Sequence, residues 1–193
     1  MNLTKLFETQ RILDTRIEKE HPRVEGEERL AKKILSLLVE LGELANEQRS
    51  WKFWSNDQEP RITKTCSFCN GLGSVKLSDH KKTCRRCGGK GSTGNPLLEE
   101  YVDCLHFILS IGLEIGEEYF DYNQNHTFKE RDITIQFLRV IDYTIGLRED
   151  DYCSELLESF THLGEMLGFT WEQVEEAYYA KNKINHERQE SGY

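Results

Sequence analysis

Apolar residues recur every three to four positions along most of the chain, which is the spacing of an amphipathic α-helix. The segment 37–54 shows this pattern clearly, because its leucines form one stripe and its glutamates line the adjacent face. The same period predicts helices over residues 4–19, 97–116, 128–145 and 152–167, and a last helix after a capping box at Thr170 and Gln173. Only three prolines interrupt the chain. The pattern predicts an all-α helical bundle.

Two of the predicted helices carry carboxylates three positions apart. Glu40 and Glu43 lie on the first, and Glu100 and Asp103 lie on the second. Neither pair has a lysine at i+4, the usual partner on an exposed helix face. Four carboxylates brought together between helices would repel one another unless cations lay between them. The pattern predicts a site for Mg2+ or Mn2+, because all-oxygen ligands favour these ions, and so indicates phosphate chemistry.

The composition limits the class of protein. Charged residues make up 31% of the chain, so solvent-exposed glutamate pairs are the alternative to a metal site. At 193 residues the chain fits one domain with a small appendage. It has no uncharged apolar run of membrane-spanning length and no signal-peptide segment, so we expect a cytoplasmic protein without membrane contact. The net charge of −9 argues against non-specific nucleic-acid binding by the whole molecule.

The charge is distributed unevenly along the chain. Residues 61–95 contain eight basic residues and one acidic residue, a charge of +7, which leaves −16 for the rest of a chain whose total is −9. Such a change in charge marks a boundary between modules. We therefore predict an inserted module at residues 61–95, here called the cysteine module, that interrupts an all-α domain formed by residues 1–60 and 96–193.

Four cysteines in this module have the spacing of a zinc ribbon. Cys66, Cys69, Cys84 and Cys87 form C-x2-C-x14-C-x2-C, and glycines follow each pair at the same positions, so the unit is an internal near-duplicate. It resembles half of the cysteine-rich region of DnaJ-type chaperones. Disulfides are the competing interpretation, but cytosolic thiols stay reduced. Four thiolates leave no open position on the metal, so we expect a structural Zn2+ with no part in chemistry.

Other polar and aromatic residues are candidates for substrate contacts. Gln10 either forms hydrogen bonds with the edge of a nucleotide base or is an amide on the protein surface. The run Trp51–Trp54 caps the core, or it shapes a pocket in which Lys52 meets phosphate and Trp54 lies against a base. His106 donates a hydrogen bond to a metal-bound carboxylate, or it is a packed core histidine.

The C-terminal helix has a polar and cationic face. The macrodipole explains cations near a helix C-terminus, but it does not explain two asparagines on the same face. The residues of this face are Lys181, Asn182, Asn185 and Arg188.

Together these motifs resemble the dimeric dUTPases, which belong to the all-α NTP pyrophosphatases that also include MazG-type enzymes. The motifs are E-x-x-E at Glu40–Glu43, the cluster Trp51–Trp54, E-x-x-D-x-x-H-F-I-L-S from Glu100 to Ser110, and K-N-x-x-N-x-x-R-Q-x-x-G-Y from Lys181 to Tyr193. The resemblance covers most of residues 3–54 and 97–193. The carboxylate pairs indicate only the superfamily, whereas the tryptophan cluster and the C-terminal motif indicate the dUTPase branch.

The resemblance implies Mg2+-dependent hydrolysis of dUTP to dUMP and pyrophosphate, with dUDP as a further substrate. It implies that Mg2+ is bound by Glu40, Glu43, Glu100 and Asp103, with Glu40 and Glu43 as catalytic residues and Glu43 orienting or deprotonating the attacking water. It assigns phosphate contacts to Lys52, Lys181 and Arg188, and nucleoside contacts to Gln10, Trp54, Asn182 and Asn185. It also implies a homodimer, encoded by a bacterium or a phage. The chain departs from the family in its inserted module and at Asp14, where a neutral amide is expected.

Three other functions share features with the sequence. A dCTP or broad-range (d)NTP pyrophosphatase would use the same carboxylates. A di-iron carboxylate oxidase would require E-x-x-H on each of two helices, and the chain has only one approximate copy, Asp103-x-x-His106. A regulatory binding protein would act through the basic cysteine module, on nucleic acid or on an acidic protein.

Overall fold

The computed structural model describes residues 2–77, 80–117, 130–150 and 152–192. Its α-helices are α1 (Leu3–Glu20), α2 (Arg29–Gln48), α3 (Pro96–Ile115), α4 (Ile133–Gly146), α5 (Cys153–Met166) and α6 (Trp171–Glu190). Strands β1 (Ser74–Leu77) and β2 (His80–Thr83) form an antiparallel hairpin. The prediction of an all-α fold is confirmed. Among the described residues, no helix is both long enough and apolar enough to cross a membrane.

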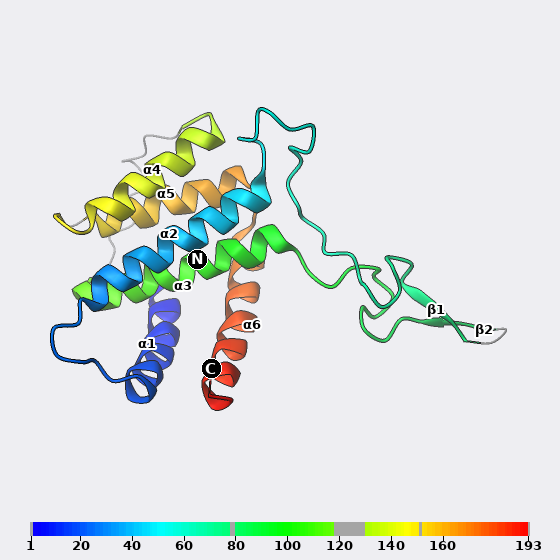
Figure 1. Ribbon diagram of the computed structural model, residues 1–193, viewed down its shortest axis with the longest axis horizontal. Helices are drawn as coiled ribbons and strands as arrows, with labels where there is room; N and C mark the ends of the chain where they lie inside the picture. Colours follow the sequence, from blue (N-terminus) through cyan, green and yellow to red (C-terminus); the bar gives the residue numbers. More distant parts are fainter. Residues whose placement is uncertain (1, 78–79, 118–129, 151, 193) are drawn as a thin grey trace.

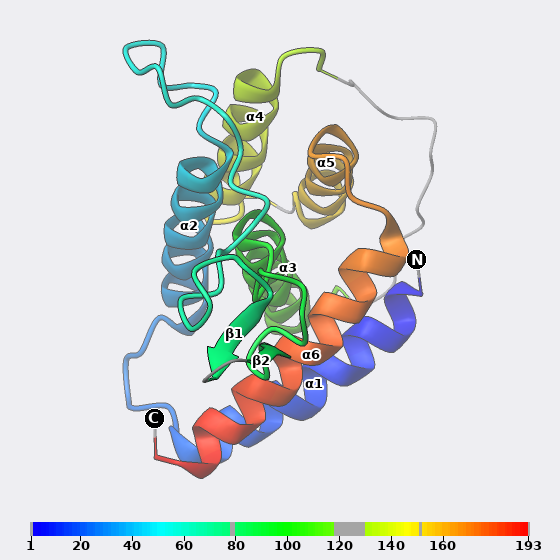
Figure 2. The same cartoon turned by 90° about the vertical axis from the view of Figure 1, so that its right-hand side faces the viewer.

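Helix α3 lies at the centre of the bundle, with α1, α2, α5 and α6 packed around it (Figure 1, Figure 2). Apolar side chains cover most of its circumference, as expected for a helix that is buried on several sides. Asn95 caps its start by accepting a hydrogen bond from the backbone N–H of Leu98 at 3.2 Å. The position of α3 therefore sets where the carboxylates of its first two turns lie.

Helix α5 holds the first turns of α3 through an aromatic contact. Tyr101 stacks on Phe160, with ring centroids 4.3 Å apart. The Tyr101 hydroxyl also donates a hydrogen bond to the carbonyl of Phe160 at 3.1 Å. Both rings are fully buried, so this contact fixes α3 next to Glu100 and Asp103.

Helix α2 ends at Gln48, so the predicted continuation of this helix to Trp54 is wrong. Arg49 has a φ of 71°, in the left-handed region, and this conformation ends the helix. The guanidinium of Arg49 donates hydrogen bonds to both carboxylate oxygens of Asp57, at 2.5 and 3.2 Å. The indole N–H of Trp51 donates at 2.8 Å to the carbonyl of Ala45, which also accepts from the backbone N–H of Arg49.

Two further helix boundaries follow from capping. Helix α4 begins at Ile133 because the Asp132 carboxylate accepts hydrogen bonds from the backbone N–H groups of the next turn. Its predicted start at residue 128 lies outside the described residues. The capping box of Thr170 and Gln173 that starts α6 is confirmed.

A two-stranded stem connects the cysteine module to the bundle. The Lys64 N–H donates to the Gly94 carbonyl at 3.0 Å, and Thr65 and Ser92 form an antiparallel bridge. In Figure 1 the stem and the hairpin extend away from the helices. The thiols of the module and the apolar side chains of the bundle belong to separate clusters. The boundaries of the module at residues 61 and 95 stay predictions.

Arg61 joins the base of this stem to both carboxylate-bearing helices. Its backbone N–H donates to the Glu47 carbonyl at 2.9 Å, and its own carbonyl accepts from the N–H of Leu97 at 3.2 Å. Its guanidinium lies 3.2 Å from the Glu47 carboxylate. One residue therefore satisfies backbone groups at the end of α2 and the start of α3, which holds these two ends together.

A charged cluster ties the loop after α1 to α2 and α3. The carboxylate of Glu114 accepts hydrogen bonds from Arg23 at 2.7 and 2.8 Å and from Lys33 at 3.0 Å. The bond from Arg23, aided by Lys33 and opposed by partial burial, lowers the pKa of Glu114 from 4.5 to about 2. The ionised carboxylate therefore stabilises the folded state.

We predict that Glu114→Gln lowers the free energy of unfolding by about 1 kcal/mol at pH 7, because Arg23 and Lys33 each lose one of their anionic partners. The folded-state pKa lies below the unfolded value of 4.5, so this stabilisation is present above pH 4.5 and is lost as the pH falls toward 2. Urea unfolding at several pH values measures the difference between variant and wild type. Glu25→Gln, at an exposed position in the same loop, is the control. A difference in unfolding free energy between variant and wild type that stays the same below pH 3 would contradict the prediction.

Candidate active site

Carboxylates from α2 and α3 meet across the interface of these two helices. One carboxylate oxygen each from Glu40, Glu43 and Glu100 lies within 4.8 Å of the other two, so the three side chains could hold a metal ion. Asp103, one turn after Glu100, instead contacts Lys181 of α6, whose Nζ lies 2.5 Å from Asp103 Oδ2. The fold thus brings the four predicted ligands into one neighbourhood, three as mutual neighbours and the fourth in an ion pair. Their role as ligands stays a prediction.

This arrangement makes the carboxylates difficult to ionise together. Burial, followed by the charges of Asp103, Glu43 and Glu40, raises the pKa of Glu100 from 4.5 to about 7. Burial, then Asp103 and Glu43, also raises the pKa of Glu40. Burial raises the pKa of Asp103 too, although the hydrogen bond from Lys181 opposes the shift. A cluster of oxygen donors with excess negative charge suits a hard divalent cation such as Mg2+ or Mn2+.

A cleft of about 660 Å3 opens beside the carboxylates, between α1, the loop after it, α2, α3 and α6. Glu40 and Asp103 line it, which connects the cleft to the acidic cluster. The predicted substrate residues that line the cleft are Gln10, Lys181, Asn185 and Arg188. The cleft therefore combines carboxylates, cations and neutral amides.

Gln10 is a buried member of a hydrogen-bond network and not a free amide. Its Nε2 donates to Asp14 Oδ1 at 2.7 Å, so its Oε1 points the other way. This oxygen accepts from the Tyr178 hydroxyl at 2.8 Å and lies 2.8 Å from His106 Nδ1. Since an amide oxygen only accepts, Nδ1 of His106 carries the proton. Gln10 thus fixes the orientation of both rings in the cleft wall.

His106 is therefore a packed core histidine rather than a partner of Asp103. Its ring stacks on Tyr178, with centroids 4.1 Å apart. Burial, followed by the charge of Lys181, lowers its pKa to about 3, so the ring is neutral. Its Nε2 is buried and has no hydrogen-bond partner in the described part of the chain.

Lys33 and Ser110 form a second polar group in the cleft with Asp14, and neither of the two was among the predicted site residues. Asp14 Oδ2 accepts a hydrogen bond from Ser110 Oγ at 2.5 Å and lies 3.4 Å from Lys33 Nζ. Lys33 lies on the same stripe of α2 as Ser36, Glu40 and Glu43, at helical spacing, and this upstream extension of the acidic stripe is the signal that could have identified it. The signal was weak because Lys and Ser are ordinary residues of an exposed helix face.

Three predicted substrate residues do not line this cleft. Lys52 donates to Asn46 Oδ1 at 2.6 Å and lies over the Trp51 ring, 5.4 Å from its centroid. Trp54 is 64% exposed on the loop after α2. Asn182 is 7% exposed, and its Nδ2 has no hydrogen-bond partner among the described residues. Their contacts with substrate stay predictions.

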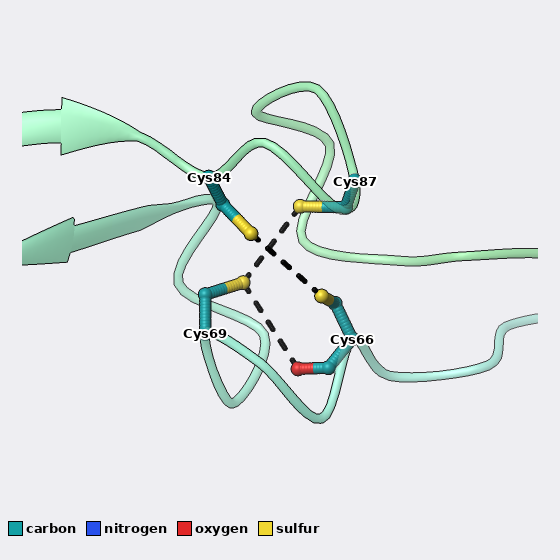
Figure 3. Close-up of side chains that lie close together, drawn as sticks. All are labelled: Cys66, Cys69, Cys84 and Cys87. Carbon is teal, nitrogen blue, oxygen red and sulfur yellow. Dashed lines mark hydrogen bonds between the residues drawn. The ribbon is translucent and has the colours of Figure 1, made fainter.

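The four cysteines of the cysteine module converge on one point (Figure 3). Sγ of Cys66 lies 3.9 Å from Sγ of Cys84, and Sγ of Cys69 lies 3.7 Å from Sγ of Cys87. All four are buried, and none forms a disulfide. Burial opposes ionisation of Cys87, but hydrogen bonds, chiefly from the Gly91 backbone, outweigh it and lower its pKa to about 7. The cluster therefore has the donor set and spacing to hold a thiophilic metal.

The two halves of this cluster are related by the sequence duplication. The N–H of Cys66 donates to the Gly91 carbonyl, and the N–H of Cys84 donates to the Gly73 carbonyl, both at 2.9 Å. A Cβ at Gly73 would lie 2.3 Å from the Gly89 carbonyl oxygen, and one at Gly91 would lie 2.4 Å from that of Gly71. The repeated glycines are thus required because each half packs its backbone against the other.

Comparison with known proteins identifies one family. A family model described as dUTPase matches residues 2–67 and 89–193, which leaves out the part of the cysteine module from 68 to 88. The match confirms the resemblance inferred from the motifs of α2, α3 and α6. A search of curated proteins found no match.

Proposed function

Because the chain belongs to the dUTPase family, we propose that this nucleotide pyrophosphatase hydrolyses dUTP to dUMP and pyrophosphate in a Mg2+-dependent reaction. The observation that carries the proposal is the meeting of Glu40, Glu43 and Glu100, from two helices, beside a cleft lined by cations and amides. Hydrolysis of dUDP to dUMP and phosphate would use the same groups. A homodimer in the cytoplasm is part of the proposal.

The carboxylates have different roles in this reaction. Glu40, Glu43, Glu100 and Asp103 would hold Mg2+ through oxygen ligands. When bound, Mg2+ supplies Lewis-acid neutralisation of phosphate charge and increases the acidity of the attacking water. Glu43, the exposed member of the cluster, would also orient this water or accept its proton, and Glu40 beside it would be the second catalytic carboxylate.

Cations and amides of the cleft would hold the nucleotide. Lys181 already contacts Asp103, and the ammonium of Lys181 together with Arg188 would neutralise charge on the phosphates. Asn185 would contact the nucleoside, and Gln10 would position Tyr178 and His106 in the cleft wall.

A dCTP pyrophosphatase is the second candidate, and Asp14 is the observation that favours it. This carboxylate lines the cleft at a position where the family resemblance leads us to expect an amide. A carboxylate only accepts hydrogen bonds, and the exocyclic amino group of cytosine donates them. Pyrophosphate release measured with each dNTP, with and without Mg2+, separates the two candidates.

We predict that Glu43→Gln and Asp103→Asn each lower kcat for dUTP by at least about 100-fold, because a missing base or ligand removes transition-state stabilisation. Helical circular dichroism should stay near wild type. Glu99→Gln, next to Glu100 on the same helix, is the control and should keep its activity. Full turnover by either variant would place the active site elsewhere. Faster release of pyrophosphate from dCTP than from dUTP by the wild type would favour the dCTP pyrophosphatase.

For the cysteine cluster, the proposal includes one structural Zn2+ per chain. Elemental analysis of the purified protein should find one equivalent of zinc, and Cys84→Ser should lose it because a tetrahedral site needs all four thiolates. Cys153→Ala removes a cysteine of α5 outside the cluster and is the control. Full zinc retention by Cys84→Ser would contradict the assignment.

The proposed homodimer is supported by apolar side chains on the outer faces of α2 and α4. These are Leu35 and Val39 of α2 and Ile135 and Leu138 of α4, which are 63%, 53%, 46% and 51% exposed. Sedimentation velocity should show a dimer, and Val39→Glu with Leu138→Glu should produce monomers because charges are poorly tolerated in an interface core. Ile12→Glu on α1, 65% exposed, is the control. A monomeric wild type would contradict this part of the proposal.

A further inference from the structure

Most cations of the cysteine module have no ion-pair partner among the described residues. Arg61, at the base of the stem, pairs with Glu47. The other basic side chains of the module are exposed, and none forms an ion pair with a described residue. They are Lys64, Lys76, Lys81, Lys82, Arg85, Arg86 and Lys90. With four thiolates and one Zn2+, the sequence charge of +7 becomes +5, so the module is basic with or without the metal.

The hairpin places some of these charges directly against one another. Lys76 of β1 lies opposite Lys81 of β2, and Lys82 lies opposite Val75, which packs on the thiols. Like charges opposite each other destabilise a strand pair. The lysines therefore reduce the stability of the hairpin and are not explained by its folding.

The segment around the first cysteine pair of the module also exposes apolar groups. Phe68, between Cys66 and Cys69, is 61% exposed, and Leu72 is 75% exposed. An exposed phenyl ring in a basic module is a platform on which an unpaired base can stack. In a duplex the bases are already stacked and paired, so such a ring would have no comparable partner.

The rest of the molecule limits where a polyanion can bind. The remaining residues carry a charge of −16, which repels phosphates. The hairpin extends away from the helices in Figure 1. A polyanion would therefore contact the module alone.

We propose that the cysteine module binds single-stranded nucleic acid, with its lysines and arginines on the phosphates and Phe68 stacked on a base. The proposal does not depend on the identity of the nucleotide substrate, because none of these side chains lines the cleft between α1 and α6. Stacking and phosphate contacts of this kind tolerate many sequences, so we expect little base specificity.

Fluorescence anisotropy of the zinc-loaded full chain with a labelled oligothymidylate tests the proposal. We expect a Kd in the micromolar range at physiological salt, and, for four to five phosphate contacts, an affinity about 50- to 130-fold weaker at 200 mM than at 50 mM salt. A duplex of the same length should bind more weakly. Polyglutamate should not displace the oligonucleotide at equal charge concentration. Displacement by polyglutamate would show an acidic protein to be the better partner and would overturn the proposal.

Variants assign the binding to particular side chains. Lys81→Glu with Lys82→Glu should weaken binding at least about 10-fold, and Phe68→Ala should weaken it about 10-fold through lost stacking. Lys183→Glu, at a lysine of α6 that is 80% exposed, is the matched control and should bind like wild type. Zinc content verifies that each module variant is folded. No binding by the wild type, or equal binding of duplex with no effect of Phe68→Ala, would overturn the proposal.

A truncated chain tests whether the module acts independently of the cleft. Replacing residues 66–91 with Asn-Gly would join the bridged pair Thr65 and Ser92 through a two-residue turn that suits antiparallel strands. Arg61 and its contacts with both helices stay in place. We expect this variant to lose single-strand binding and to keep dUTP hydrolysis. Single-strand binding by the truncated chain would overturn the proposal.

Discussion

The packing of α2 against α3 is the interaction on which the rest of the molecule depends. This interface brings together Glu40, Glu43 and Glu100, whose mutual repulsion and burial oppose the same packing. Buried leucines of both helices, such as Leu41, Leu44 and Leu105, belong to one core and each contribute about 1.5–3 kcal/mol. The apolar packing of α2 and α3 therefore holds together an acidic cluster that would not assemble by itself. A divalent cation would reduce the repulsion between its carboxylates.

The same interface explains how the fold accommodates the long segment between its two carboxylate-bearing helices. The segment between α2 and α3 leaves the bundle and returns through paired strands, so its two ends lie side by side. Arg61 bonds to the last turn of α2 and to the first turn of α3 at the base of this stem. Since the connection is closed there, residues beyond the stem can be added without changing the separation of the two helices.

Polar residues in the core give the cleft a defined wall. Gln10 joins Asp14, Tyr178 and His106, which come from α1, α6 and α3. Each of these groups would be costly to bury without its partner, so the network selects one arrangement of the three helices. The cleft thus depends on buried hydrogen bonds as well as on apolar packing.

The sequence by itself determined the helical class, the paired carboxylates, the cysteine spacing and the family, because these depend on local periodicity and on short motifs. It located the capping box of α6, because that signal is local. It wrongly extended α2 into Trp51–Trp54. The left-handed conformation of Arg49 that ends α2 is stabilised by Asp57, and hydrophobic periodicity does not show this contact. Only the tertiary structure decided that the buried side chain of Gln10 connects residues of three helices through hydrogen bonds, that Asp103 contacts Lys181, and that Lys33 lines the cleft. These facts join residues far apart in the chain, and the packing of α1, α3 and α6 sets their distances.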